Sequence, residues 1–208
     1  MGAVLSDRFV AAPTENSSDG WRERRRRKIL EAAAQHFSDQ SYHSVTMDQV
    51  AASADMGKAT LYRYFASKED LYVAVFDDAL STLTDLLQDE IAKGGDSADV
   101  LSRVIHVLVP ELWSHLRGLK AFDGGEVQLA ERKRRMFRER RRTLTQQIED
   151  VLRHGLEKGE IRDLDCRMTA ELIIGMTWAS AATSPADQAA PLADLIADVF
   201  LNGTLRKP

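Results

Sequence analysis

Two short helical segments separated by a three-residue break constrain the fold of this chain more than any other sequence feature. Thr46-Met47-Asp48-Gln49 matches a capping box, which predicts a short helix starting at about Thr46. Asp55-Met56-Gly57 interrupts that run, and a second segment begins at once with Lys58, which leaves room only for a tight turn. This spacing is typical of a helix-turn-helix.

Apolar residues recur at helical spacing through most of the remaining sequence, and no segment alternates convincingly as a strand. An all-α fold of about nine helices is therefore predicted. Pro110, Gly124-Gly125, Gly159 and Pro185 are expected to separate the later ones. The expected helices cover 21–39, 46–54, 58–65, 68 to the Gly94-Gly95 pair, 97–109, 111–122, 127–158, 165–182 and 191–204.

The 208 residues, of which 44% are hydrophobic, suffice for a sizeable core in two parts. Residues 1–20 lack periodicity and are predicted to be a disordered tail. Residues 21–67 are expected to form a helix-turn-helix domain, and residues 68–208 a helical domain for ligand binding and dimerisation. The long helix that follows Ser67 would link the two.

The charge is unevenly distributed along the chain, although its net value is −4. Residues 21–65 carry eight basic and five acidic side chains, whereas residues 66–208 carry 19 basic and 24 acidic ones. A basic N-terminal part on an acidic remainder fits a protein that contacts phosphate with one end only. The arginine run that begins with Arg24 and Arg25 is expected to contact the DNA backbone, although it could also be a solvated helix face.

The segment from Lys58 to Phe65 divides into two faces. Leu61 and Phe65, four residues apart, are expected to pack inward. The remaining side chains would be free to enter the major groove or to contact phosphate. These outward or flanking candidates are Lys58, Ala59, Thr60, Tyr62, Arg63 and Tyr64, with Thr46 as a further phosphate site at a helix N-terminus.

The stretch from Val45 to Leu71 closely resembles the DNA-binding domain of the TetR (tetracycline repressor) family. Its densest part is Thr60-Leu61-Tyr62-Arg63-Tyr64-Phe65, followed by Ser67-Lys68-Glu69. A weaker C-terminal resemblance rests on the Gly155 to Arg162 turn and the helix after it. By the motif match, DNA-contact roles pass to Thr46, Lys58, Ala59, Thr60, Tyr62, Arg63, Tyr64 and Lys68, and operator specificity is expected of Lys58, Ala59 and Arg63.

The resemblance also implies a homodimer that binds a palindromic double-stranded DNA operator, with a pocket for a small-molecule inducer in each C-terminal domain. Most such proteins are repressors that the ligand releases from DNA. Aromatic and apolar residues in this domain favour a partly hydrophobic effector. The candidate pocket residues are Trp113, Phe122, Phe137, Met176 and Trp178, although such residues also build ordinary cores.

The last two helices carry more apolar surface than one small domain needs, which predicts a dimer interface. If they instead close the protomer's own core, that argument fails. The candidate interface residues are Leu172, Ile173, Met176, Ala179, Leu192, Leu195, Ile196, Val199 and Phe200.

Two features leave alternatives open. The dense basic block from Arg132 to Arg142 is either an attractor for an anionic ligand or further DNA, or a solvated face whose arginines pair with acids such as Asp85, Asp89 and Glu90. Cys166, near a helix start, is either a redox-sensitive thiol or a small apolar residue.

The sequence argues against several other classes of protein. It contains no phosphate-binding glycine loop, no nucleophile elbow and no paired cysteine motif, so no enzyme, cofactor or metal is expected. His106 and His115 lack a third metal ligand at a suitable offset. No stretch is apolar enough to span a membrane, and a cytoplasmic location is expected. The remaining rival is an adaptor that uses the same helices for protein contacts, which would bind insensitively to salt.

Overall fold

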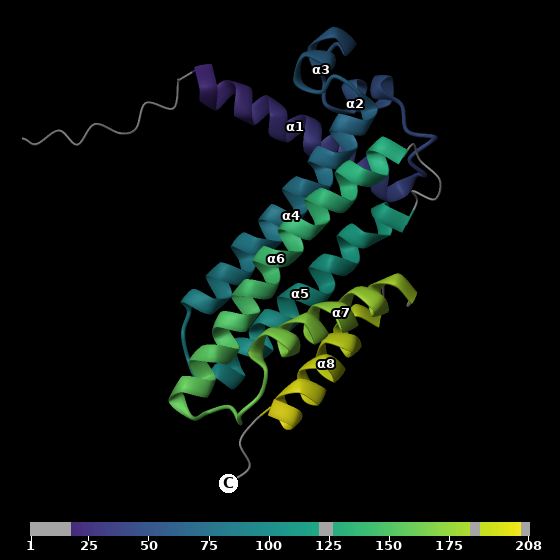
Figure 1. Cartoon of the computed structure of the whole chain (residues 1–208). Helices are drawn as coiled ribbons and strands as arrows, with labels where there is room; N and C mark the ends of the chain where they lie inside the picture. Colours follow the sequence, from purple (N-terminus) through teal and green to yellow (C-terminus); the bar gives the residue numbers. More distant parts are fainter. Residues whose placement is uncertain (1–17, 121–126, 184–187, 205–208) are drawn as a thin grey trace, which may run out of the picture.

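The computed structural model describes residues 18–120, 127–183 and 188–204, and in these ranges the chain forms eight α-helices and no strand (Figure 1). The all-α prediction is confirmed. The helices are α1 Ser18–Asp39, α2 Met47–Ser53, α3 Lys58–Tyr64, α4 Lys68–Ala92, α5 Ser97–Lys120, α6 Val127–Lys158, α7 Cys166–Thr183 and α8 Ala189–Thr204.

The predicted number of helices was wrong by one, because α5 continues through Pro110. Proline removes one backbone hydrogen bond, which usually ends or kinks a helix. Here Val109, Leu112 and Trp113 on either side of it are all buried, so packing keeps both halves in one helix. At the N-terminus, α1 begins at Ser18, inside the predicted tail; residues 1–17 lie outside the described residues.

The helices form a head, α1 to α3, on an elongated body, α4 to α8 (Figure 1). The long helices α4, α5 and α6 run side by side along the body, and α7 and α8 pack against α5 at its lower end. One hydrophobic core extends through both parts. No helix in the described ranges is long and apolar enough to cross a membrane.

An aromatic cluster joins the head to α4. Phe37 of α1, Tyr42 from the loop before α2, and Tyr72 and Phe76 of α4 are all buried, and Tyr72 makes edge contacts with the other three rings at centroid distances of 4.6 to 5.0 Å. Such pairs are favourable beyond the area that they bury. The head is therefore firmly attached to the first two turns of α4.

The Gly155 to Arg162 turn ends α6 and also supports the start of α5. The Gly155 carbonyl accepts hydrogen bonds from the amides of Glu160 and Ile161, and Gly159 has a φ of 74°, a conformation that favours glycine. The Glu160 carboxylate accepts a hydrogen bond of 2.9 Å from the Ser97 amide, which caps α5. A hydrogen bond with the Ser97 side chain, and after it this bond from the Ser97 amide, lower the pKa of Glu160.

An ion pair joins α5 to α8 and should make stability depend on pH. The two ring N–H groups of His106 donate to the Ser102 carbonyl at 2.7 Å and to the Asp194 carboxylate at 2.9 Å. The hydrogen bond to Asp194 is the main cause that raises the pKa of His106, and the bond to Ser102 adds to it. Both nitrogens donate, so this arrangement favours the protonated ring.

We expect His106→Gln to destabilise the protein at acidic pH and to have little effect at alkaline pH. The pKa is higher in the folded than in the unfolded state, so the stabilisation is complete below the unfolded value, about 6.5, and is lost as pH rises through the folded value. Urea unfolding of both proteins across this range measures the difference in free energy. A difference that grows with rising pH would contradict the assignment.

Candidate DNA interface

The first helix of the motif, α2, begins as the sequence predicts. The Thr46 hydroxyl accepts from the Gln49 amide at 3.3 Å, and the Gln49 side-chain oxygen accepts from the Thr46 amide at 2.8 Å. The predicted capping box is therefore confirmed. Thr46 is exposed beside the N-terminal amides of α2, a position in which a backbone phosphate could bind.

The second helix, α3, is held by its inner face. Leu61 is fully buried and Phe65 nearly so, as predicted. Asp55, in the turn before it, has a φ of 55°, the left-handed conformation that aspartate tolerates and that reverses the chain within three residues. The inner face of α3 is therefore packed in the core, and its outer side chains are exposed.

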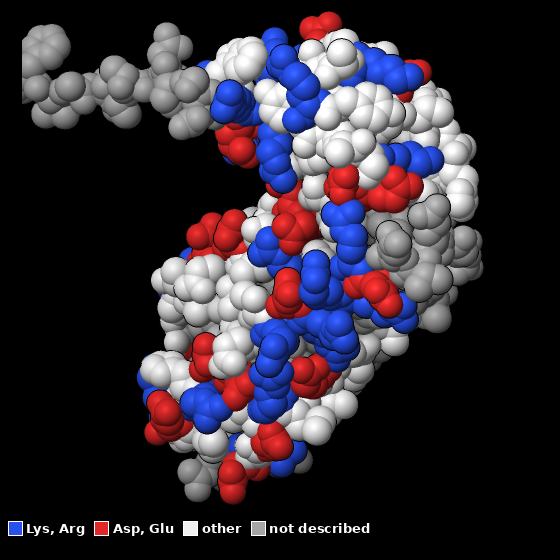
Figure 2. Space-filling view, turned by 45° about the horizontal axis from the view of Figure 1, so that its top comes forward, with Lys and Arg blue, Asp and Glu red and all other residues white. Residues whose placement is uncertain are grey.

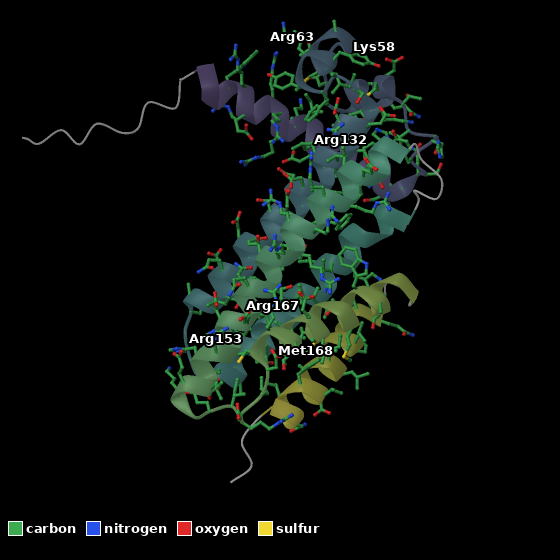
Figure 3. All side chains as sticks on the ribbon, viewed as in Figure 1. Lys58, Arg63, Arg132, Arg153, Arg167 and Met168 are labelled. Carbon is green, nitrogen blue, oxygen red and sulfur yellow. The ribbon has the colours of Figure 1, made fainter. Side chains whose placement is uncertain are left out.

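The outer face of α3 presents Lys58, Ala59, Tyr62 and Arg63 to solvent. Tyr62 is 43% exposed, which is high for a large aromatic residue, whereas Tyr64 is half-buried against the core. Of the two candidate tyrosines, Tyr62 therefore points outward, whereas Tyr64 packs partly against the core. Lys58 and Arg63 lie at the tip of the head (Figure 3).

Lys58 already has one anionic neighbour. Its ammonium group donates to the Asp48 carboxylate of α2 at 3.0 Å, and this hydrogen bond raises the pKa of Lys58. The pair is fully exposed, so its electrostatic energy is small. Lys58 can exchange Asp48 for a phosphate or a guanine edge without a large cost.

Lys68 is placed differently from the other motif residues. Its ammonium donates to the backbone carbonyls of Tyr42 at 2.9 Å and Val45 at 3.0 Å, and it lies 4.3 Å from the centre of the Tyr42 ring. These contacts fasten the start of α4 to the loop that precedes α2. The structure thus gives Lys68 a positioning role within the head.

The arginine of α1 that lies beside Arg63 of α3 is Arg22, which precedes the run predicted to contact DNA. Arg22 lines a groove of about 570 Å³ together with Trp21, Arg63 and Tyr64. Arg24 is exposed, whereas the Arg25 guanidinium stacks 3.9 Å from the centre of the Trp21 ring. Which arginine lies beside Arg63 depends on how α1 packs against the other helices of the head, and no local pattern contains that information.

The basic block on α6 is only partly neutralised (Figure 2). Arg132 pairs with Asp70 at 2.6 Å, Arg140 with Asp77 at 2.7 Å and Arg141 with Glu171 at 2.6 Å. These three arginines therefore pair with acids, and their partners differ from the three acids suggested from the sequence, although the charge of Asp85 also acts on Arg140. The hydrogen bond from the Ser67 side chain lowers the pKa of Asp70, and the hydrogen bond from Arg132 lowers it further.

The predicted dimer residues separate into two groups. Ile173, Ile196 and Phe200 are buried in the protomer's own core, because they face α5 and the neighbouring helix, and they are unavailable to a partner. This corrects the sequence-based assignment for these three, and Leu192 is half-buried. The residues that do reach solvent are Leu172, Met176, Ala179, Leu195 and Val199, and Met168 joins them, 57% exposed.

The predicted pocket residues also separate. Phe137 and Trp178 meet edge to face, with ring centroids 5.1 Å apart, beside a void of only about 10 Å³ between α4, α5, α6 and α7. A void of this size holds at most one water molecule. Trp113 packs in the core without lining this void, Met176 faces solvent instead, and Phe122 lies outside the described residues.

Cys166 is buried at the start of α7, and burial raises the pKa of its thiol. A raised pKa lowers the fraction of reactive thiolate, which favours the small apolar role. Within the described ranges, no three His, Cys, Asp or Glu side chains are grouped as a metal site would require.

A short capped helix, a tight turn and an exposed second helix, mounted on a long helical body, define a helix-turn-helix transcriptional regulator. Two family models match the chain, one of bacterial regulatory proteins of the TetR family over residues 29–75 and one of the tetracycline repressor-like C-terminal domain over residues 94–182. The chain belongs to the TetR family.

Several known proteins are similar to it. The fatty acid metabolism regulator protein of Bacillus subtilis is 24% identical over 160 residues, which cover 71% of this chain and 77% of that protein. The activator FasR of Mycolicibacterium smegmatis is 40% identical over 62 residues, 30% of this chain and 28% of that protein.

Solved structures share the fold across most of the chain. FadR of Bacillus subtilis in complex with stearoyl-CoA has a TM-score of 0.70 at 18% identity, and covers 85% of this chain and 98% of its own. A TetR/AcrR-family regulator from Thermobifida fusca has a TM-score of 0.72 at 22% identity, and covers 88% and 100%.

Proposed function

We propose that this regulator is a cytoplasmic repressor that binds a palindromic operator as a homodimer and releases it when a small, partly hydrophobic effector binds. The observation that carries the proposal is the outer face of α3, where Lys58, Ala59, Tyr62 and Arg63 are exposed on a helix held only by its inner side. A helix so presented fits the major groove, and its basic and hydroxyl groups suit phosphate and base edges. Thr46 and Arg22 extend the contact to the backbone on either side.

The homodimer is supported by an apolar face that no other part of the described chain covers. Met168, Leu172 and Met176 recur every four residues on α7, and Leu195 and Val199 do the same on the adjacent α8. Side chains of this size at such exposure mark an interaction surface. Two copies that pack these helices together would form a four-helix interface about a twofold axis.

The effector is proposed to enter between α4, α5, α6 and α7, where Phe137 and Trp178 line the small void. The walls are almost entirely apolar, which favours a ligand with an apolar chain. The similarity to a regulator named for fatty acid metabolism, and to a structure holding stearoyl-CoA, supports a fatty acyl compound. The void is closed in this structure, so binding must separate the helices and thereby move α4 and the head.

We expect the purified protein to enrich a palindrome from a random pool of duplexes, and Tyr62→Ala and Lys58→Ala each to weaken binding to it. Lys58→Ala should lower the salt dependence of binding by about one counterion per protomer, since one phosphate contact is lost. Titration of labelled duplex at several salt concentrations measures both effects.

Lys93→Ala is the matched control, because Lys93 is equally exposed but lies at the far end of α4. It should bind the duplex as the unmodified protein does. Absence of enrichment at low salt would exclude the proposal, and binding that is insensitive to salt would favour the protein adaptor instead.

A further inference from the structure

The void between α4 and α7 has one charged residue in an otherwise apolar lining. Leu80, Leu112, Phe137, Leu144, Ile174 and Trp178 supply the apolar walls, and Arg141 of α6 supplies the remaining side chain. The Arg141 side chain lines the closed void and is also 48% exposed, so it lies between the void and solvent. A cation at the edge of an apolar space is complementary to a molecule with an apolar chain and an anionic end.

The guanidinium of Arg141 is occupied by the protein's own carboxylate. It donates to Glu171 of α7 at 2.6 Å, and Glu171 also accepts from Arg167, one turn earlier on α7, at 3.2 Å. Arg167 in turn donates to Glu149 of α6, which also pairs with Arg153. Alternating charges thus join α6 to α7, with Arg153 and Arg167 at the lower end of the body (Figure 3).

Neighbouring arginines do not share this position. Arg142 is exposed, does not line the void and makes no ion pair among the described residues. Arg140 is turned to the opposite side and holds Asp77 of α4 through two hydrogen bonds. Among these three consecutive arginines, Arg141 alone combines contact with the void and a carboxylate that a ligand could replace.

We propose that Arg141 is the anion-binding residue of the effector site, and that the effector is an amphiphile with its anionic group directly on an alkyl chain. The inference rests on the proposed function and specifies its ligand class. In the closed state Glu171 holds the position of the anion. The ligand's anion replaces Glu171 on the guanidinium, while its chain separates Phe137 from Trp178 and occupies the space that opens.

The exchange has a consequence for the dimer surface. Glu171 directly precedes Leu172, which lies on the exposed apolar face of α7. When Glu171 leaves Arg141 it keeps its pair with Arg167, on its own helix, so one of the two ion pairs that the described residues form between α6 and α7 is broken. The remaining link, from Arg167 to Glu149, acts as a pivot for α7. Ligand binding and the dimer interface are thereby coupled through a single ion pair.

The test is calorimetric titration of the full chain with dodecanoate, dodecyl phosphate and dodecanol. Dodecanoate, dodecyl phosphate or both should bind more tightly than the alcohol, and the two acids identify which anion the site prefers. Arg141→Gln should weaken binding of the preferred acid by about tenfold, the size of one charge-assisted hydrogen bond at a half-exposed site, and leave the alcohol unchanged. Arg142→Gln is the matched control and should alter neither.

Glu171→Gln separates this proposal from a purely structural ion pair. Loss of the competing carboxylate should tighten acid binding severalfold, whereas a pair that merely holds α6 to α7 would give unchanged or weaker binding. Equal affinity for acid and alcohol, or an Arg141→Gln variant that binds the acid normally, overturns the proposal.

Dodecanoyl-coenzyme A serves as a further probe, because its phosphates lie far from its chain. If only this thioester binds, and Arg141→Gln binds it normally, the assignment of Arg141 is overturned while the regulator function stands. If the protein binds its operator but none of the four compounds, the assignment of Arg141 is likewise overturned and the regulator function stands. Failure of the unmodified, ligand-free protein to bind any operator would instead reject the proposed function itself.

Discussion

Replacement of Leu172 and Leu195 together by glutamate is expected to convert the proposed dimer to a monomer and to reduce operator affinity by at least about a hundredfold. Both side chains are more than half exposed in the protomer, so the charges cost little in the protomer's own fold. In a dimer they would place like charges in a desolvated apolar interface. Affinity falls because two half-sites are no longer bound by one linked pair of heads.

Sedimentation measures the oligomeric state, and anisotropy of labelled duplex measures the affinity. Leu86→Glu is the matched control, because Leu86 is an exposed leucine on α4, away from the proposed interface. It should remain dimeric and bind DNA normally. A doubly substituted protein that stays dimeric would mean that copies associate through another surface.

Gly155→Ala is expected to destabilise the protein by about 1–3 kcal/mol, the usual cost of overpacking a filled site. A Cβ there would lie 2.6 Å from the Ser97 hydroxyl and 2.7 Å from a methyl carbon of Ile161. Neither neighbour can move freely, because Ser97 begins α5 under the Glu160 cap and Ile161 is buried in the core. Urea unfolding at a fixed protein concentration measures the change in free energy of unfolding.

Gly175→Ala provides the contrast within the same protein. A Cβ at Gly175 of α7 meets nothing within 4 Å, and alanine is favoured over glycine in a helix interior by roughly 0.5–1 kcal/mol. This variant should be slightly more stable. If Gly155→Ala proved equally harmless, the close contact of α6 with α5 would not be maintained in solution.

The helix-turn-helix was predictable because its determinants are local. The capping box at Thr46, the break at Asp55 to Gly57 and the i, i+4 pair Leu61 and Phe65 all act within a few residues, and the structure contains each of them. Pro110 shows the converse. Its local signal for a helix end is overridden by burial on both sides, which depends on helices distant in the sequence.

The candidate sites in the body were harder to predict for the same reason. Periodicity shows that α7 and α8 are apolar, but it does not distinguish Ile173, which faces the protomer's core, from Leu172, which faces solvent. Each of these two residues could face either the core or solvent until the position of α5 is known. Similarly, the partners of Arg132, Arg140 and Arg141 are acids 30 to 63 residues away in the sequence, and no pattern within α6 identifies them.

Because the aromatic cluster attaches the head to the start of α4, a small rotation of α4 moves the head by a larger distance. A helix of 25 residues is about 37 Å long. The head is attached to its first turns by the contacts of Tyr72 with Phe37 and Tyr42, so it follows any rotation of the axis. A rotation of about 5° about the far end would displace the head by roughly 3 Å. In the proposed dimer, a ligand as wide as one alkyl chain can therefore move the two heads out of alignment on a rigid DNA helix. No part of either protomer needs to unfold.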